Sequence, residues 1–277
     1  MPLSLAEVVP VHLFHDGPFK WRLATRALAS ADWLQFDDGV DEYLREKERV
    51  LRVHGDDAVA WQAGSEAPSS EVAELIEHEV VARGRAMPER GMSEHPLVWA
   101  CRAVQEDLCV LERGSNGWIF SAAAVCFPTR WSPAAKVGLG LTEVHEPVPR
   151  YDTIATTVER FFDRLRPGAM AWRPNWSIVG DGRLRLPAND RQAPAQLDDE
   201  PERSLWLRVE RQTIRRLVEH PDAIVFGVRI HRWPLASAIA GVEQAVAAEL
   251  RSMPEDVAAY KNLEQWRHHL AERLAAR

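Results

Sequence analysis

The N-terminal part of the chain carries the apolar spacing of amphipathic helices. Apolar residues recur at helical intervals in three segments: 41–54, 70–84 and 96–107. Gly55 and Gly84 stand where the first two helices would end, and Ser69 is a candidate cap for the second. We therefore expect a helical part over residues 1–107 that packs on the rest of the chain.

The pattern then changes to the two-residue period of β-strands. Apolar runs at 108–113 and 118–127 flank Gly114-Ser115-Asn116-Gly117, a hairpin signal because Asn and Gly tolerate positive φ. A connector broken by Pro and Gly leads to a predicted helix at 152–165. Three more strand-like runs follow, at 169–179, 204–214 and 223–233. The polar, Pro-containing stretch 181–203 is expected to be an exposed loop.

This order of elements predicts an α+β fold. Hairpins on both sides of one helical crossover indicate a PAS-like, five-stranded, curved antiparallel sheet over residues 108–233. Residues 234–277 are expected to form two amphipathic helices separated at Met253-Pro254-Glu255, since proline suits the first turn of a helix. These C-terminal helices could pack on the core or form a homo-oligomer.

Composition narrows the function classes. The 277 residues can bury a large core, and a net charge of -7 with acids and bases intermingled argues against nucleic acid as a partner. Three cysteines without zinc-site spacing favour a reducing compartment. Because no targeting segment or long apolar run is recognisable, we expect a cytoplasmic protein with no membrane partner. The eleven tryptophans suit a large core and leave room for a flat ligand.

The segment 144–149, VHEPVP, is the most informative for chemistry. Its two prolines fix φ and disfavour the α-region at the preceding residues, so we expect a stiff, extended backbone that presents His145 in one direction. A rigidly held neutral imidazole is suited to be an axial iron ligand. From spacing alone, a structural role is favoured, in which His145 caps the next helix or bonds to nearby backbone.

Other polar residues in the predicted strands are candidate site residues. On strand 204–213, alternation places Arg208 and Glu210 on one unusually polar face, for which a solvated face with a cross-strand ion pair is the alternative. Further candidates for cofactor contacts are Phe127, Trp131, Arg173, Asn175 and Arg229. For Arg229 an inter-strand salt bridge is the simpler reading, and Trp176 is expected in the core.

Competing ligand candidates are weaker. His231 alternates with apolar residues and is read as a rim histidine, whereas His268 and His269 lie on a polar terminal helix. Cys126 is a possible thiolate ligand, although a cysteine inside an apolar strand is usually inert packing.

Five runs resemble one known family in order. VQEDLCVLE, AAVCFPTRW, VHEPVPRY, RPNWSI and LRVERQTIRRL are similar to the haem-dependent oxidative N-demethylases, and the resemblance covers about residues 20 to 260. The resemblance implies a PAS-fold subunit that binds haem b and oxidises a small secondary amine with dioxygen. It also implies that NADPH, FMN and 2Fe-2S centres deliver electrons, through a reductase or ferredoxin, and that tetrahydrofolate takes up formaldehyde. No dinucleotide fingerprint or cysteine cluster is present, so these groups are expected on partner proteins.

Under this resemblance, His145 ligates the iron and Arg173 and Arg229 meet haem propionates. Arg208 would then polarise dioxygen, and Glu210 would hold an ammonium or accept its proton. Two alternatives remain open: a haem-based gas or redox sensor on the same scaffold, and a PAS-like scaffolding protein whose pocket is filled by side chains.

Overall fold

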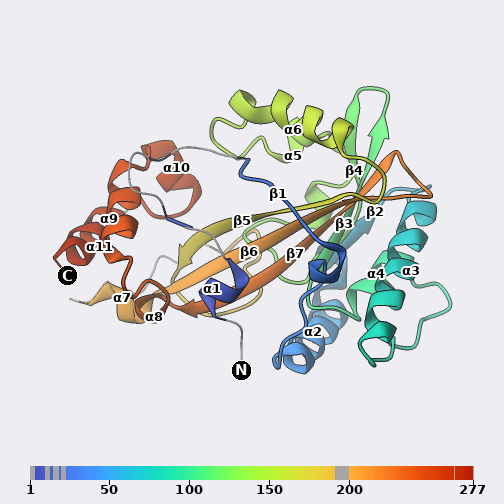
Figure 1. The fold of residues 1–277 in the computed structure, drawn as a ribbon, viewed down its shortest axis with the longest axis horizontal. Helices are drawn as coiled ribbons and strands as arrows, with labels where there is room; N and C mark the ends of the chain where they lie inside the picture. Colours follow the sequence, from blue (N-terminus) through green and yellow to red (C-terminus); the bar gives the residue numbers. More distant parts are fainter. Residues whose placement is uncertain are drawn as a thin grey trace.

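The chain is centred on one antiparallel sheet of seven strands in the residues that the structure describes (Figure 1). The structure is a computed structural model that describes residues 4–9, 13–14, 19, 23–190, 200–264 and 266–276. The strands are β1 (Arg26–Ala27), β2 (Val59–Trp61), β3 (Asp107–Gly114), β4 (Gly117–Ala124), β5 (Met170–Val179), β6 (Trp206–Arg216) and β7 (Ala223–Pro234). Their order across the sheet is β1-β5-β6-β7-β3-β4-β2.

The predicted α+β class and antiparallel sheet are confirmed, but the strand count is not five. The five expected strands occupy adjacent positions, and β1 and β2 extend the sheet at its two edges. These edge strands are two and three residues long, too short to produce a periodic signal. The strand β4 ends at Ala124 rather than at residue 127.

The helices surround the sheet. They are α1 (Leu5–Val8), α2 (Val40–Ala58), α3 (Glu66–Ala82), α4 (Pro96–Cys101), α5 (Leu141–Val144), α6 (Asp152–Arg164), α7 (Pro201–Ser204), α8 (Leu235–Ala238), α9 (Glu243–Ser252), α10 (Glu255–Tyr260) and α11 (Arg267–Ala275). Figure 1 shows α9, α10 and α11 gathered at the end of the sheet opposite α3 and α4. None of the described helices combines the length and the hydropathy that crossing a bilayer requires.

Several predicted helix limits are wrong for local reasons. The helix α3 is flanked by Ser65 rather than Ser69, and Gly55 lies inside α2. The helix α4 stops at Cys101, whose carbonyl oxygen accepts a hydrogen bond from the buried Lys47 instead of extending the helix to residue 107. The described C-terminal part holds four short helices rather than two.

Positive φ angles account for these extra C-terminal breaks. Gly241 at φ 84° separates α8 from α9, and Asn262 at φ 55° follows α10. Neither conformation can continue a right-handed helix. The boundary predicted at Pro254 is confirmed, because Pro254 caps the start of α10.

Each face of the sheet is covered by different helices. On one face Leu111, Ile214 and Ile224 pack beneath α6, and we call this the α6 face. On the other, Val110 and Val225 pack against α3 and α4, and we call this the α3 face. The C-terminal helices cover the far end of the α3 face, where strand side chains such as Trp176 and Val209 join the largest apolar cluster. The expectation of Trp176 in the core is confirmed.

The stretch predicted as an exposed loop at 181–203 is partly buried. Leu184 and Leu186 are 5% and 3% exposed, and Leu186 forms an isolated bridge with Thr129. The loop is therefore drawn onto the α6 face by its two leucines despite its polar composition. Residues 191–199 of this stretch lie outside the described residues.

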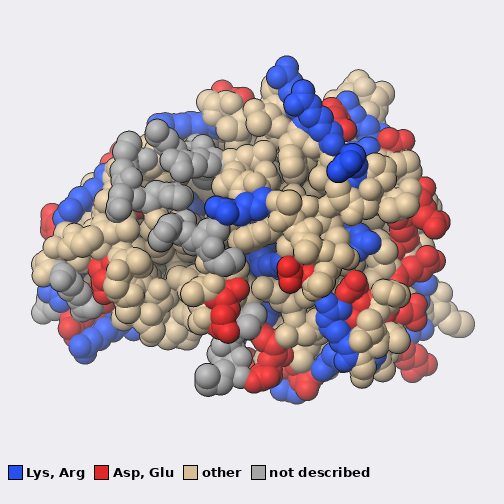
Figure 2. Space-filling view, in the orientation of Figure 1, with Lys and Arg blue, Asp and Glu red and all other residues tan. Residues whose placement is uncertain are grey.

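Surface charge follows the intermingling seen in the sequence. Figure 2 shows acidic and basic side chains side by side over the end of the molecule that carries α2, α3 and α4. Several of them form exposed ion pairs, such as Arg49 with Glu46 and Arg102 with Glu48. Such pairs contribute to solubility more than to stability.

Candidate functional site

His145 lies at the end of α5, where the backbone differs from the prediction. Its φ and ψ of −101° and 9° are not extended, and a turn from His145 to Val148 follows. The prolines of this segment stiffen that turn rather than an extended strand. The expectation of an extended backbone is therefore wrong.

The imidazole of His145 is nevertheless held in one orientation. Its Nδ1 lies 2.8 Å from the carbonyl oxygen of Leu141, and its ring stacks on Tyr151 with centroids 4.3 Å apart and planes 6° from parallel. A carbonyl oxygen can only accept, so Nδ1 is the protonated nitrogen and Nε2 carries the lone pair. Nε2 has no hydrogen-bond partner among the described residues.

The surroundings keep this imidazole neutral. Burial lowers the pKa of His145 to about 4, and the positive charges of Lys136 and Arg173 act in the same direction. The hydrogen bond to Leu141 opposes this change in pKa only in part. At neutral pH the imidazole of His145 is therefore neutral, with its proton on Nδ1 and a lone pair on Nε2, which is the form of histidine that can bind a metal.

Arg173 and Glu210 lie on the α6 face of the two neighbouring strands β5 and β6. Strand register places Asn175 directly opposite Glu210 and Arg173 opposite Gln212. Because alternation continues from Ile214, these side chains share the face on which α6 packs. The structure thus brings Arg173 and Asn175, which were predicted separately, to the same face as Glu210.

The carboxylate of Glu210 accepts three hydrogen bonds. Thr129 donates to Oε1 at 2.6 Å, whereas Asn175 and Gln212 donate to Oε2 at 3.2 Å and 2.8 Å. Nearby, Gln212 Oε1 accepts from Arg173 at 3.3 Å. Glu210 is therefore fixed in position by three neutral donors, and no guanidinium forms a direct ion pair with it among the described residues.

Arg173 connects Glu210 to the His145 side of the site. Burial lowers the pKa of Arg173, and Glu210 and Tyr151 oppose that effect through their charges, so these groups are close in space. The Nε of Arg173 and the hydroxyl of Tyr151 are buried without a hydrogen-bond partner in the described structure. Both atoms are therefore available to a polar group that binds at this site.

Arg208 has a structural role: its guanidinium binds two loops together, an arrangement that we call the Arg208 clamp. Its Nε donates to Thr129, Nη1 donates to the carbonyls of Arg183 and Leu184, and Nη2 donates to the carbonyls of Phe127 and Pro128. All five N–H groups of a guanidinium are thereby occupied by protein acceptors. Arg208 joins two loops beneath β6 and reaches Glu210 through Thr129.

The remaining predicted residues lie in different places. Trp131 contacts Phe120 edge-to-face at 6.2 Å and packs with the cluster that contains Tyr151. Phe127 belongs instead to a cluster beneath α2, with its ring 5.7 Å from that of Tyr43.

Arg229 does not join the candidate site. It pairs in register with Arg211, which places it on the α3 face, and it forms a buried ion pair with Asp37 at 3.1 Å. The salt bridge expected for Arg229 is therefore present, although its partner comes from the N-terminal part rather than from a neighbouring strand.

Sequence reasoning missed residues that only folding brings to the site. Tyr260 and Lys261 come from α10 and the turn after it, and the charge of Glu210 influences the pKa of both. Loss of solvent contact is the largest cause in each case: it lowers the pKa of the buried Lys261 to about 8, and it raises the pKa of Tyr260, which is 44% exposed. Lys261 donates to the carbonyl of Trp176 at 2.6 Å. Nothing local in the sequence distinguishes these two residues from a solvated helix end.

A cavity of about 850 Å³ lies elsewhere on the α6 side. It is bordered by α2 and the 183–189 segment, and Glu46, Asp57, Arg49 and Arg185 are among its lining residues. Arg49 and Arg185 form ion pairs with Glu46 and Asp57, so these four side chains bind one another across this cavity.

The comparison with known families identifies the chain's relatives. Residues 79–271, more than half of the chain, match the family described as haem-dependent oxidative N-demethylase, alpha subunit-like. The chain belongs to this family. The matched segment contains His145, Arg173 and Glu210, and it includes α4 to α10 and five strands of the sheet. No curated protein matches the chain. The description of the demethylase family names an alpha subunit, which indicates a system of several subunits.

Proposed function

We propose that this chain is the haem-bearing oxygenase subunit of an oxidative N-demethylase system. Its core would be PAS-like, because β5, β6, β7, β3 and β4 follow one another in a continuous antiparallel sheet with α6 across one face. The observation that carries the proposal is the state of His145: a neutral, oriented imidazole whose Nε2 forms no hydrogen bond to the described residues and whose pKa is lowered in part by the charge of Arg173.

The residues around His145 fit haem b. Iron requires a neutral imidazole nitrogen, and a hydrogen bond from the other ring nitrogen to a carbonyl is the usual support of such a ligand. Haem also brings two carboxylates, which need cationic partners. Arg173 has an unpartnered buried Nε, and Lys136 lies close enough to His145 to lower its pKa. Because Arg229 is committed to Asp37, we assign the propionate contact to Arg173 and Lys136 instead.

When bound, the haem supplies the binding and activation of dioxygen. Glu210 provides the anionic group that holds the ammonium of a small secondary amine or accepts its proton. Thr129, Asn175 and Gln212 keep that carboxylate in place through their three hydrogen bonds. Arg208, whose donors are all occupied, acts by holding the Thr129 loop rather than by contacting dioxygen.

The remaining components belong to partner proteins under this proposal. NADPH, FMN and a 2Fe-2S centre deliver electrons through a reductase or ferredoxin, and tetrahydrofolate takes up the formaldehyde. The alpha-subunit description of the family supports such a division among chains. Pairing of two copies through the C-terminal helices is a further part of the proposal.

Haem titration tests the ligand assignment. Purified protein with added haem is expected to show a Soret band, and His145→Ala should lose or strongly shift it. His231→Ala is the matched control, because His231 is also buried but bonds Gln35 on the α3 face. Both variants should retain the wild-type circular dichroism spectrum. Wild-type protein that takes up no haem, or an unchanged spectrum in His145→Ala, would refute the proposal.

Amine turnover tests the role of Glu210. With a reductant system and dimethylamine, the haem-loaded protein should release formaldehyde, and Glu210→Gln should reduce kcat about 100-fold or more. The Soret band should survive, because glutamine retains the size and most hydrogen bonds of the site. Oxygen consumption without formaldehyde release from wild-type protein would instead favour the sensor alternative.

A further inference from the structure

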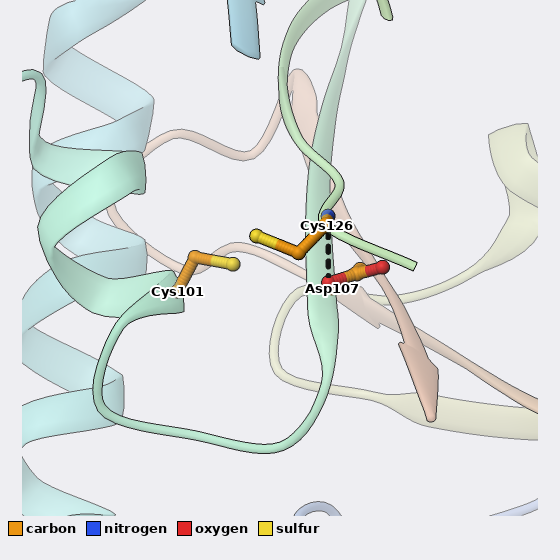
Figure 3. Close-up of side chains that lie close together, drawn as sticks. All are labelled: Cys101, Asp107 and Cys126. Atoms are coloured by element: carbon orange, nitrogen blue, oxygen red, sulfur yellow. Dashed lines mark hydrogen bonds between the residues drawn. The ribbon is translucent and has the colours of Figure 1, made fainter. Parts of the chain in front are cut away.

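Two thiols and a carboxylate share a buried site outside the candidate active site. Cys101 ends α4, Asp107 begins β3 and Cys126 follows β4 (Figure 3). The two Sγ atoms and a carboxylate oxygen of Asp107 all lie within 4.8 Å of one another. Figure 3 shows the two sulfur atoms pointing toward each other. All three residues are at most 1% exposed.

The ammonium group of Lys47, on α2, is the positive charge that contacts this group of residues. Its Nζ donates to Cys101 Sγ and to the Cys101 carbonyl, each at 3.1 Å, and pairs with Asp107 at 3.2 Å. Lys47 also donates to the carbonyl of Glu106. A metal ion would compete with this ammonium for the same sulfur and oxygen atoms. The arrangement therefore suits thiol chemistry rather than metal binding.

The two thiols differ in their electrostatic surroundings. Interaction with the Cys126 thiol and the charge of Lys47 lower the pKa of Cys101 against the effect of burial. Interaction with Cys101 and burial raise the pKa of Cys126 well above its ordinary value. The Cys101 thiol donates to the Ala124 carbonyl at 3.3 Å. Two thiols that face each other, one with a lowered pKa beside an ammonium, are the arrangement that favours oxidation to a disulfide, with the thiolate form of Cys101 as the nucleophile. Cys109, the third cysteine, is buried but lies outside the group.

We propose that Cys101 and Cys126 are a redox-active dithiol that a peroxide converts to a disulfide. The Cys101 thiolate attacks one peroxide oxygen, the O–O bond breaks, and the leaving hydroxide is protonated to water. Cys126 then attacks the sulfenic sulfur of Cys101, the S–O bond breaks, and a second water leaves with the Cys126 proton. Two thiols lose two electrons, and hydrogen peroxide is reduced to two waters.

A disulfide at Cys126 would affect the candidate active site, because Thr129 follows Cys126 by three positions and is hydrogen-bonded to Glu210. The N–H groups of Cys126 and Phe127 donate to Asp107 at 3.1 Å and 2.7 Å. Pro128 and Thr129 follow directly, and Thr129 donates to Glu210. A disulfide would fix the distance between the Cys101 and Cys126 backbones and so constrain the segment that positions Glu210 through Thr129.

Peroxide treatment followed by mass spectrometry tests the proposal on the wild-type chain. Hydrogen peroxide should remove about 2 Da, two hydrogen atoms, from the intact mass. Peptide mapping should join the peptides that contain Cys101 and Cys126, and dithiothreitol should reverse both changes. An unchanged mass, a link that involves Cys109, or stable oxygen addition to Cys101 alone would overturn it.

Single-cysteine variants sharpen the assignment. Cys109→Ser should still lose about 2 Da with peroxide, whereas Cys101→Ser and Cys126→Ser should not. Circular dichroism must show that each variant is folded. Should the two site variants fail to fold, the wild-type peptide map and the Cys109→Ser variant still decide the outcome. None of these readouts depends on haem or on amine oxidation, so the proposed function and the dithiol can fail separately.

Discussion

At the scale of single residues, the structural contacts of His145 also prepare it for the ligand role that we propose. Its bond to the Leu141 carbonyl is the backbone contact that spacing alone favours. That contact also fixes the proton on Nδ1 and leaves Nε2 as an acceptor. The stacking of Tyr151 then limits rotation of the ring. Under the proposed function, a residue oriented in this way would lose little further freedom on binding iron.

The lowered pKa of His145 predicts a pH dependence of folding. In the unfolded chain histidine has a pKa of 6.5, and the fold lowers it to about 4, so between these values the unfolded chain binds more protons. Stability must therefore fall as the pH falls from about 6.5 to 4, by about 1–3 kcal/mol from this residue. In His145→Gln, urea unfolding across this range should show a smaller loss than wild type.

Comparison of the wild type with His145→Gln isolates the contribution of His145 to the pH dependence of stability. His95 and His231 also have lowered pKa values through burial, but both are present in wild type and variant. Their contributions cancel in the difference between the two unfolding free energies. Parallel pH profiles would mean that His145 is protonated in the fold as readily as in the unfolded chain.

At the scale of elements, alternation along β6 could be read from the sequence but its partners could not. The two-residue period places Arg208, Glu210 and Gln212 on one face, as the structure confirms. The acceptors of Arg208 come from segments 127–129 and 183–184, far away in the chain. Only the tertiary fold reveals that Arg208 is saturated while Arg173 retains a buried N–H.

The errors in element boundaries have the same origin. The helix α4 ends at Cys101, whose carbonyl oxygen accepts a hydrogen bond from Lys47. In the polar loop, the side chains of Leu184 and Leu186 are buried against the rest of the protein. Each depends on a contact between residues distant in sequence. The five strands, α2 and α6 were predictable because each is long enough to display its period. The short helix α5, which ends next to His145, was not predicted, and α10 was predicted to begin after Pro254 but not to end before Lys261.

The clamp formed by Arg208 predicts a large stability effect. In Arg208→Lys the charge remains, but an ammonium cannot reach four carbonyls and a hydroxyl at once, so buried acceptors lose their donors. We expect a loss of about 3 kcal/mol in urea unfolding. Arg49→Lys is the control, since its exposed pair with Glu46 should change stability by less than about 1 kcal/mol. Equal effects of the two substitutions would exclude the clamp.

At the scale of the whole molecule, the apolar clusters join segments from both ends of the chain. The largest contains Val8 near the N-terminus, Val209 on β6 and Leu270 on α11. The predicted division at residues 107 and 233 therefore describes changes in secondary structure along the chain, whereas the packing crosses both boundaries. We infer that the C-terminal helices and the sheet depend on each other for folding.

Leu270→Ala tests this dependence. Leu270, on α11, is fully buried in the apolar cluster that also contains residues of the strands. Its truncation leaves a cavity and should lower the unfolding free energy by about 2–5 kcal/mol. Because the cluster is shared, tryptophan fluorescence and far-ultraviolet circular dichroism should still report one coincident transition, moved to lower urea. A separate early transition of helical signal, with the sheet unfolding at its wild-type midpoint, would show that α9 to α11 form an independent unit. The position of Lys261 beside Glu210 would then be a docking arrangement, whereas a single transition makes it part of one folded core.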